Sequence, residues 1–354
     1  IATVSMNKKV LLGVSGGVDS SVAAYLLQKQ GYEVTGFTLK LWRDEIYGKT
    51  DFIGDAREVC RVLGIPHIVL DYSEEFRKTV IQNFRLEYEL GRTPNPCIVC
   101  NKFIKFGKVF EQMYQMNYDY VATGHYSKVF YDEESGRYLI RKSSAHTKDQ
   151  TYMHYNLSQE QLKHTLFVLG DYDKSQVRSI AAEAGLPTAG KKDSQEICFI
   201  ENDDYIDFLK KQFGITGEPG NFIDETGNIL GEHRGIIHYT IGQRKGLGIA
   251  FGQPMFVTEI NAADNTVTLG RKGMEYRKEF VIRDTNFIPF DFLEEPQRFW
   301  GKVRYSQKEQ PALLTPLSDK RVMVTFDEPQ RAVTPGQSAV FYDGDILVGG
   351  GVIE

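Results

Sequence analysis

The sequence lacks the long apolar runs and the cysteine density that mark two large classes of protein. None of its apolar runs approaches the ~20 residues that a membrane-spanning helix needs, and no secretory signal opens the chain. Four cysteines in 354 residues are too few for a disulfide scaffold, which favours a reducing compartment. We therefore expect a cytoplasmic protein that does not enter a membrane.

An excess of positive charge is also missing. The 42 Lys and Arg residues face 47 Asp and Glu residues, so the net charge is −5. This balance argues against a broadly basic surface that holds nucleic acid regardless of sequence. Local basic pairs remain, and each alone predicts a solvated surface: Arg141-Lys142, Lys191-Lys192, Arg244-Lys245, Arg271-Lys272 and Arg277-Lys278.

The first 140 or so residues alternate short apolar runs with amphipathic helical patterns. The apolar runs predict strands over 10–14, 34–41, 67–70 and 120–123, and the helical patterns fall over 20–30, 55–63 and 74–90. Such alternation predicts an α/β fold, a parallel sheet with helices on both faces. In sheets of this kind, ligands bind beyond the carboxyl ends of the strands.

The second half of the chain changes in texture. Two capping boxes predict two short helices between residues 158 and 185, namely Ser158 with Gln161 and Asp173 with Gln176. A further helix is expected over 205–213. After Gly217, closely spaced turn signals between alternating segments predict two small β-barrel-like units that meet near residue 280. We expect three domains, with boundaries at 6–207, 208–280 and 281–354.

A glycine-rich segment follows the first predicted strand and opens the first predicted helix: Gly13-Val14-Ser15-Gly16-Gly17-Val18-Asp19-Ser20. Backbone N–H groups at a helix N-terminus favour an anion, and adjacent glycines let the backbone approach a phosphate closely. The serines add hydroxyl donors, and Asp19 can hold Mg²⁺ directly or through water. The Lys-Ser/Thr pair of a Walker A loop is absent. The segment therefore predicts a phosphate loop of another kind; the alternative is a plain strand–turn–helix junction.

Two cysteines lie three positions apart on a proline-braced loop that leads into a predicted helix: Thr93-Pro94-Asn95-Pro96-Cys97-Ile98-Val99-Cys100. A thiol near a helix N-terminus tends to have a lowered pKa and hence a more reactive thiolate. A third cysteine stands almost a hundred residues further on, in Asp193-Ser194-Gln195-Glu196-Ile197-Cys198-Phe199. Cys60, inside a predicted helix, has the pattern of a small buried hydrophobe.

These motifs resemble known families. Residues 15–20 resemble the pyrophosphate loop of the ATP-pyrophosphatase superfamily, whose members adenylate a carbonyl oxygen. The cysteine regions, with 122–126, 148–152 and 238–247, resemble the tRNA-specific 2-thiouridylase family over essentially Lys8 to Glu354. The resemblance implies an adenine nucleotide α-hydrolase-like fold in 6–207, with a helical tRNA-binding insert near 158–190. It implies ATP-dependent adenylation of the 2-oxygen of a wobble uridine in tRNA, followed by sulfur transfer that gives 2-thiouridine, AMP and pyrophosphate.

The resemblance also implies roles for individual residues. Cys198 would carry a persulfide, and Cys100 would be its catalytic partner, able to form a disulfide with it. ATP would be bound by Gly13, Val14, Ser15, Gly16, Gly17, Val18, Asp19, Ser20, Leu39 and Gly124, and the target base by Asn95, Pro96 and Cys97. The tRNA would be contacted by His125, Lys148, Asp149, Gln150, Arg304, Tyr305 and Gln337. The implied cofactors are ATP and Mg²⁺, and the implied partners are tRNA and a sulfur-donor protein, either a cysteine desulfurase or a relay carrier.

Other interpretations stay open on the residues alone. Some members of the family carry aspartate where this chain has Cys97. Cys97, Cys100 and Cys198 could instead ligate an iron–sulfur cluster with one open iron site, or zinc. The rival functions are another adenylating ligase or amidotransferase with the same loop, and a non-enzymatic RNA- or metal-binding module. The sequence gives no oligomeric state.

Overall fold

The computed structural model describes residues 8–42, 51–188, 190 and 197–354. The pair Lys191-Lys192 and residues 193–196 of the motif before Cys198 lie outside this part of the chain. Two compact units are formed. The first comprises residues 1–79, 97–195 and 345–348, and the second comprises 80–96, 196–344 and 349–354. Within the described ranges, no helix combines the length and the apolarity needed to cross a bilayer.

The first unit is built on a five-stranded sheet in the order β3-β2-β1-β4-β7. Every neighbouring pair is parallel. The strands are β1 (Lys9–Gly13), β2 (Glu33–Lys40), β3 (His67–Asp71), β4 (Tyr120–Thr123) and β7 (Thr165–Phe167). The strand order reverses between β1 and β4, and a crevice at the carboxyl ends of two such strands is where doubly wound sheets bind ligands.

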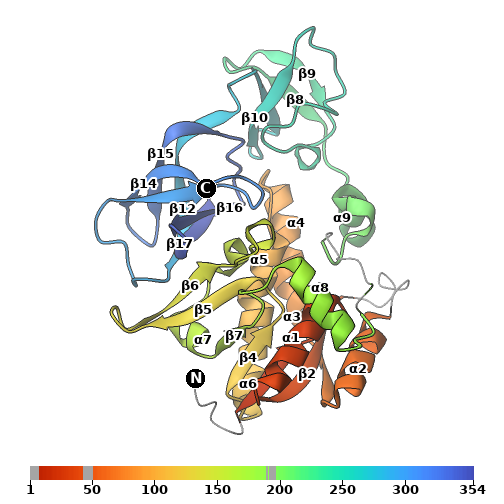
Figure 1. The fold of residues 1–354 in the computed structure, drawn as a ribbon. Coiled ribbons are helices and arrows are strands. Elements are labelled where there is room, and N and C mark those ends of the chain that lie inside the picture. Colours follow the sequence, from red (N-terminus) through yellow and green to blue (C-terminus); the bar gives the residue numbers. More distant parts are fainter. Residues whose placement is uncertain (1–7, 43–50, 189, 191–196) are drawn as a thin grey trace. The chain divides into compact units, whose positions relative to one another are not determined.

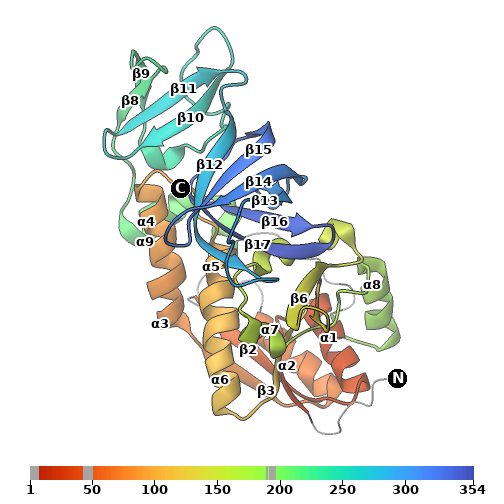
Figure 2. The same ribbon diagram turned by 90° about the vertical axis from the view of Figure 1, so that its left-hand side faces the viewer.

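Helices cover both faces of this sheet, as the sequence predicts. One face packs apolar side chains of β1, such as Val10 and Leu12, against α1 (Val18–Lys29), α2 (Phe52–Leu63) and α8 (Lys174–Glu183). Figure 2 shows α1 and α2 on one side of the strands, and α3 (Ser73–Phe76) and α6 (Val109–Gln115) on the other. The predicted α/β class is therefore confirmed.

The elements between residues 96 and 188 are partly as predicted. Both capping boxes form, at the start of α7 (Gln159–Lys163) and of α8. The short strand β7 lies between these helices and completes the sheet. The sequence did not predict it, nor the hairpin of β5 (Ser127–Asp132) and β6 (Arg137–Lys142). The remaining elements of this stretch are α5 (Pro96–Cys100), the π-helix η2 (Asn101–Lys108), and the 3₁₀ turns η3 (His146–Lys148) and η4 (Thr151–His154). A further π-helix, η1 (Arg77–Ile81), lies earlier in the chain, directly after α3.

The second unit carries two small β structures after its helices, which are α4 (Gln82–Glu89), the 3₁₀ turn η5 (Glu201–Asp203) and α9 (Tyr205–Phe213). The first β structure is a four-stranded sheet in the order β10-β11-β8-β9, around a core that includes Phe222 and Val257. Its strands are β8 (Gly220–Ile223), β9 (Ile229–His233), β10 (Met255–Asn261) and β11 (Thr266–Arg271), with the 3₁₀ turn η6 (Ile236–His238) after β9.

The second β structure is a closed barrel, in blue in Figure 1. Its six strands follow the order β12-β15-β14-β13-β16-β17, and pairing between β12 and β17 closes it. The strands are β12 (Tyr276–Phe287), β13 (Gln297–Lys302), β14 (Gln310–Pro316), β15 (Val322–Arg331), β16 (Ser338–Asp343) and β17 (Ile346–Ile353). β12 runs through residue 280, where the sequence predicts a boundary; the three-domain division stays a prediction.

Candidate active site

The phosphate loop (residues 13–20) leaves β1 at the switch point of the sheet and enters α1. Gly16 has a φ of +77°, and a Cβ there would lie 2.8 Å from Cβ of Asp55. The N-cap of α1 is Gly17, which has no side chain to bond the N–H groups of the first turn. Those N–H groups therefore suit an anion, as the sequence predicts.

The residues of the loop differ in what they offer. The N–H of Val14 donates to the carbonyl of Phe37 at 2.8 Å, and the carbonyl of Val14 accepts from Thr38 Oγ1 at 2.8 Å. The Val14 backbone is thus used in packing on β2. The hydroxyls of Ser15 and Ser20 instead converge, with their Oγ atoms 3.3 Å apart. The loop presents these hydroxyls and the backbone from Gly16 onward.

Leu39 lies on one strand that flanks β1, and Gly124 lies directly after the other. Gly124 follows β4, and a Cβ at this position would lie 2.8 Å from the backbone nitrogen of Ser20. Only a glycine therefore allows the end of β4 to lie this close to the loop. Leu39 is half-buried near the carboxyl end of β2, in register with Leu70 of β3.

The carboxylate of Asp19 has two partners that the sequence analysis missed. Its Oδ1 atom accepts from Nζ of Lys174 at 2.6 Å and from the hydroxyl of Tyr126 at 2.8 Å. Lys174 is the first residue of α8, 155 positions along the chain from Asp19. Because Oδ1 already has two donors, a metal ion on that atom would displace one of them. We therefore treat magnesium as part of a magnesium–ATP substrate.

Both cysteines of the proline-braced loop lie on α5, which begins at Pro96. Cys97 is an exposed residue, whereas Cys100 is 7% exposed. Removal of water by the surrounding protein raises the pKa of Cys97, and the charge of Lys105 acts in the opposite direction. This is the reverse of the lowering expected at a helix N-terminus. Cys60 is buried as predicted, and burial raises the pKa of its thiol to about 11.

Two buried polar side chains near α5 were not singled out from the sequence. Asn101, next to Cys100, is 5% exposed; its Nδ2 donates to the carbonyl of Met153 at 3.3 Å. His154 is 1% exposed, and its Nδ1 lies 2.9 Å from Oγ of Ser127. Neither Asn101 Oδ1 nor His154 Nε2 has a hydrogen-bond partner among the described residues. Burial lowers the pKa of His154 to about 3, so this imidazole is neutral.

His125 lies against this cluster. Its Nδ1 is 2.6 Å from Oγ1 of Thr123, and its ring centroid is 4.7 Å from that of His154. Burial is the main cause that holds the pKa of His125 well below its usual value, and the neighbouring His154 and Lys105 act in the same direction. A contact from His125 to tRNA would therefore come from a neutral imidazole.

Residues 148–150, expected to contact tRNA, lie in a turn that their own side chains stabilise. Asp149 accepts from the N–H of Ser143 at 3.0 Å and from Oγ1 of Thr151 at 2.6 Å. Gln150 accepts from the N–H of Tyr126 at 2.9 Å. Through Tyr126, Gln150 is linked to Asp19 of the phosphate loop. All three residues are half-buried.

In the second unit, Gln337 is bonded to the loop that precedes Asn95 and Pro96. Its Nε2 donates to the carbonyls of Thr93 and Pro94, at 3.0 Å each. The N–H of Thr93 in turn donates to the carbonyl of Pro335 at 2.9 Å. The residues expected to contact the target base therefore follow an anchored segment.

Cys198 also lies in the second unit, exposed at the surface. The next residue, Phe199, is buried against Phe84 and Phe208, with ring centroids 5.2 and 5.1 Å away. The buried ring of Phe199 thus anchors the chain next to a cysteine that stays exposed.

Arg304 and Tyr305, also in the second unit, differ in their exposure: Arg304 is half-buried and Tyr305 is exposed. Arg304 donates to Oγ1 of Thr334 at 2.6 Å, whereas the ring of Tyr305 is 42% exposed.

A metal cluster on the three cysteines has no support in the described geometry. Throughout the described part of the chain, no three His, Cys, Asp or Glu side chains gather as ligands. We therefore derive no step through an iron–sulfur cluster or zinc.

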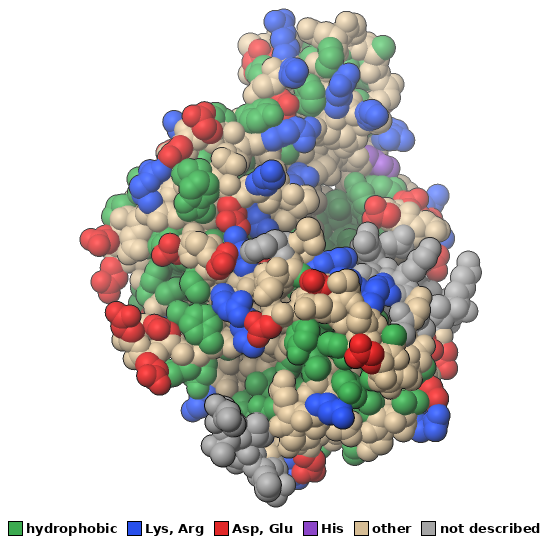
Figure 3. Space-filling model, in the orientation of Figure 1, with side chains coloured by type: hydrophobic (Ala, Val, Ile, Leu, Met, Phe, Trp, Pro, Cys, Tyr) green, Lys and Arg blue, Asp and Glu red, His purple; other side chains and the backbone are tan. Residues whose placement is uncertain are grey.

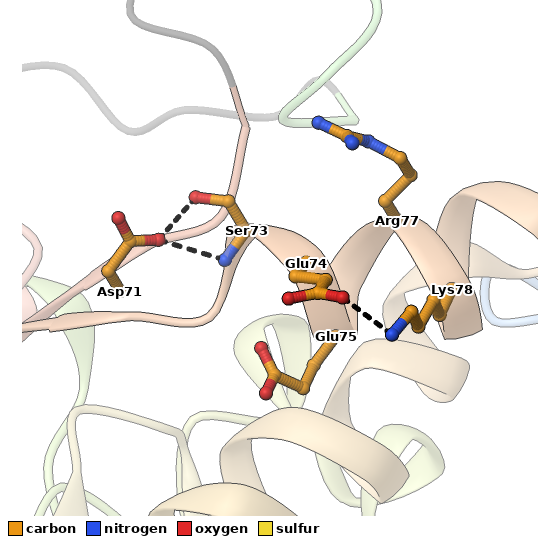
Figure 4. A pocket seen from close by; sticks show the side chains of 6 residues that line it. All are labelled: Asp71, Ser73, Glu74, Glu75, Arg77 and Lys78. Carbon is orange, nitrogen blue, oxygen red and sulfur yellow. Dashed lines mark hydrogen bonds and ion pairs between the residues drawn. The ribbon is translucent and has the colours of Figure 1, made fainter.

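A polar pocket of about 540 Å³ lies at the carboxyl end of β3 and along the start of α3, and none of the residues that line it belongs to the phosphate loop (Figure 4). Its lining combines three carboxylates with two cations: Asp71, Glu74, Glu75, Arg77 and Lys78, together with the hydroxyl of Ser73. Asp71 accepts from the hydroxyl and the N–H of Ser73, and Glu74 pairs with Lys78 at 2.6 Å. Because negative charge prevails, this pocket suits a phosphate poorly.

Comparison with known proteins decides the family. Three family models match successive parts of the chain: a tRNA methyl transferase HUP domain over 8–202, a tRNA methyl transferase PRC-barrel domain over 206–271 and an aminomethyltransferase beta-barrel domain over 277–353. The tRNA-specific 2-thiouridylase MnmA of Clostridioides difficile is 54% identical over 356 residues, which covers 99% of both chains. That of Acetivibrio thermocellus is also 54% identical, over 98% of this chain and 99% of the relative.

The chain belongs to the tRNA-specific 2-thiouridylase family. The resemblance drawn from the motifs is thereby confirmed. Among solved structures, the U34-tRNA thiolase NcsA from Methanococcus maripaludis is 20% identical, with a TM-score of 0.35. It covers 59% of this chain and 67% of its own. We base nothing on so distant a likeness.

Proposed function

We propose that this protein is a tRNA-uridine 2-sulfurtransferase that adenylates the 2-oxygen of a wobble uridine with ATP and then replaces that oxygen with sulfur. One observation carries the proposal: a phosphate loop lies at the switch point of the sheet in a chain 54% identical over its length to proteins named 2-thiouridylases. We expect it to act in the cytoplasm, on tRNA and with a sulfur-donor protein.

The first step makes a poor leaving group into a good one. A lone pair of the uridine 2-oxygen attacks the α-phosphorus of ATP, and the bond to the bridging oxygen breaks. Pyrophosphate leaves with that electron pair, and the N3 proton passes to solvent. The backbone N–H groups after Gly16 and the hydroxyls of Ser15 and Ser20 would stabilise the charge on the phosphates.

The second step uses the thiols. The terminal sulfur of a persulfide on Cys198 attacks C2 of the uridine, and AMP leaves with the 2-oxygen. The Cys100 thiolate then attacks the sulfur of Cys198, which releases 2-thiouridine and leaves a disulfide. An external dithiol reduces that disulfide before the next turnover. The exposure of Cys198 suits loading by a donor protein, and the burial of Cys100 suits a thiol kept from side reactions.

Binding of tRNA would rest on local features, since the net charge is negative. Exposed Lys and Arg side chains lie on the four-stranded β structure, and Figure 3 shows cationic side chains over this part of the chain (top). They include Arg234, Arg244, Lys245, Arg271 and Lys272. The exposed ring of Tyr305 could stack on an unpaired base. The target base must leave the anticodon stack to reach the site, as in other enzymes that modify nucleobases.

A second candidate, methyl transfer, comes from the descriptions of two matching family models. It would require neither cleavage of ATP to AMP and pyrophosphate nor an intact Cys198. We favour sulfur transfer because the phosphate loop and the thiols of Cys100 and Cys198 would otherwise have no use. The two products differ in mass, so one assay separates the two activities.

The test is mass spectrometry of nucleosides from unmodified tRNA after incubation with the protein, magnesium–ATP and a persulfide-generating donor. Wild type, Cys198→Ala and Cys100→Ala are compared with Cys60→Ala, which removes a buried thiol that no step uses. We expect 2-thiouridine from wild type and Cys60→Ala alone, and only with ATP. A methylated nucleoside, or thiolation that survives both Cys198→Ala and Cys100→Ala, would refute the proposal.

A further inference from the structure

The phosphate loop has no cation of its own. Residues 13–20 contain neither lysine nor arginine, and Asp19 adds a negative charge. The triphosphate of ATP carries several negative charges, and its cleavage concentrates charge on the departing pyrophosphate. Hydroxyls and N–H groups beside a carboxylate neutralise such a group only in part. A cation from elsewhere in the chain would complete the site.

Lys174 is placed to be that cation. Its Nζ lies 2.6 Å from Oδ1 of Asp19 and 5.9 Å from the ring centroid of Tyr126. The Tyr126 hydroxyl donates to the same carboxylate oxygen at 2.8 Å. The Lys174 side chain is 17% exposed, so it reaches the loop from a largely enclosed position. Two contacts thus hold the ammonium group beside the first turn of α1.

The position of Lys174 in its own helix does not explain why a cation is found there. It is the first residue of α8, directly after the capping residue Asp173. The helix dipole disfavours a cation there by roughly 0.3–1 kcal/mol. The charge therefore acts outside the helix, and the structure shows it directed at the phosphate loop.

We propose that Lys174 binds the β- and γ-phosphates of ATP and stabilises pyrophosphate as it leaves. This deepens the adenylation step and rests on the proposed function for that step. An ammonium group has three N–H donors, so Lys174 can hold Asp19 and donate to a phosphate oxygen together. When the bond between the α-phosphorus and the bridging oxygen breaks, the electron pair moves onto a group that Lys174 contacts.

The test is isothermal titration of the full chain with magnesium–ATP, magnesium–pyrophosphate and AMP. Lys174→Met and Lys174→Gln are compared with Lys163→Met, which removes an exposed lysine of α7. We expect affinity for ATP and pyrophosphate to fall roughly ten- to hundredfold, as for a lost hydrogen bond to a charged group. AMP affinity should stay within about twofold, and Lys163→Met should match wild type. Thermal unfolding of both Lys174 variants is measured first, and the titrations are interpreted with the one whose unfolding midpoint matches that of wild type.

A double variant separates direct binding from neutralisation of Asp19. If Lys174 only cancels the carboxylate charge, Asp19→Asn in the Lys174→Met background restores ATP affinity, and that result overturns the proposal. If Lys174 binds phosphate, the double variant stays weak. An equal loss of affinity for ATP and for AMP in the Lys174 variants also overturns the proposal, because such a loss indicates that Lys174 has a structural role. These titrations need no tRNA, so they are decided independently of whether thiolation is observed.

Discussion

The side-chain amide of Gln337 donates to the carbonyls of both Thr93 and Pro94, at 3.0 Å each, across 244 and 243 positions of the chain. This bond holds the segment directly before Asn95 and Pro96, the residues expected to meet the target base. Gln337 therefore has a positioning role in the unliganded protein, whatever contact it makes with tRNA.

Gln337→Ala should loosen this segment. It removes both donors, so we expect the backbone amide of Thr93, bonded to Pro335, to exchange about tenfold faster. Hydrogen exchange with mass spectrometry of the peptide around residue 93 measures this. Gln330→Ala, which removes only a local bond to Glu328, serves as the matched control. Thiolation should slow while ATP affinity stays within about twofold; unchanged exchange at Thr93 would show that Gln337 does not anchor the segment.

Gly124→Ala should damage the phosphate loop. The new Cβ would lie 2.8 Å from the backbone nitrogen of Ser20, so either β4 or the loop must shift. Overpacking of this kind costs about 1–3 kcal/mol, and we expect ATP affinity to fall about tenfold or more. Titration with ATP measures it. Gly190→Ala, where a Cβ meets no described atom within 4 Å, is the control. Equal affinities for ATP in Gly124→Ala and Gly190→Ala would show that Gly124 is not part of the ATP site.

The buried His154 should make stability depend on pH. Burial lowers its folded pKa to about 3, whereas the unfolded value is about 6.5. Below pH 6.5 the unfolded chain binds a proton at His154 that the folded chain does not bind. The contribution of neutral His154 to the free energy of unfolding is therefore complete above pH 6.5 and is lost as pH falls toward 3. From pH 7.5 to 5.5 the free energy of unfolding should fall by about 1.4 kcal/mol through His154 alone.

His154→Phe provides the comparison for this pH effect. Phenylalanine keeps the stacking on Phe167 and cannot take up a proton. The free energy of unfolding of wild type minus that of the variant, measured by chemical denaturation, should therefore fall by about 1.4 kcal/mol from pH 7.5 to 5.5. Parallel curves over this range would mean that His154 is not buried in its neutral form.

The thiols should differ in access. Cys198 is exposed, whereas Cys60 and Cys100 are 1% and 7% exposed. We expect iodoacetamide to alkylate Cys198 at least about tenfold faster than either buried thiol, since reaction requires access as well as thiolate. Peptide mass spectrometry over time gives the rates, and denatured protein gives the reference in which all four react. Comparable rates for Cys100 and Cys198 in the native protein would contradict the proposed division of roles.

Local patterns in the sequence predicted much of the first unit. The capping boxes at Ser158 and Asp173 predict the starts of α7 and α8 correctly, because all the hydrogen bonds of a capping box form within four consecutive residues. The glycine-rich turn between β1 and α1 also forms where the local pattern predicts it, and its binding of phosphate stays a prediction. The three-residue strand β7 is too short to show a period, and only its parallel pairing with β4 makes it part of the sheet.

The contacts that complete the site depend on residues far apart in sequence. Lys174 and Asp19 meet across 155 positions, and no local pattern connects them. A lysine at the start of a helix, where the dipole disfavours it, was the one available signal. The pKa of Cys97 was predicted in the wrong direction because the sequence showed the helix end but not the water that the surrounding protein removes.

The central claim is that the uridine 2-oxygen departs with AMP. We would incubate the protein with magnesium–ATP, a sulfur donor and tRNA whose uridines carry a heavy oxygen isotope at position 2, and then analyse the nucleotides by mass spectrometry. The account predicts that AMP acquires the label in step with 2-thiouridine formation, while pyrophosphate stays unlabelled. Thiolated product accompanied by unlabelled AMP, or by label in pyrophosphate, would contradict it.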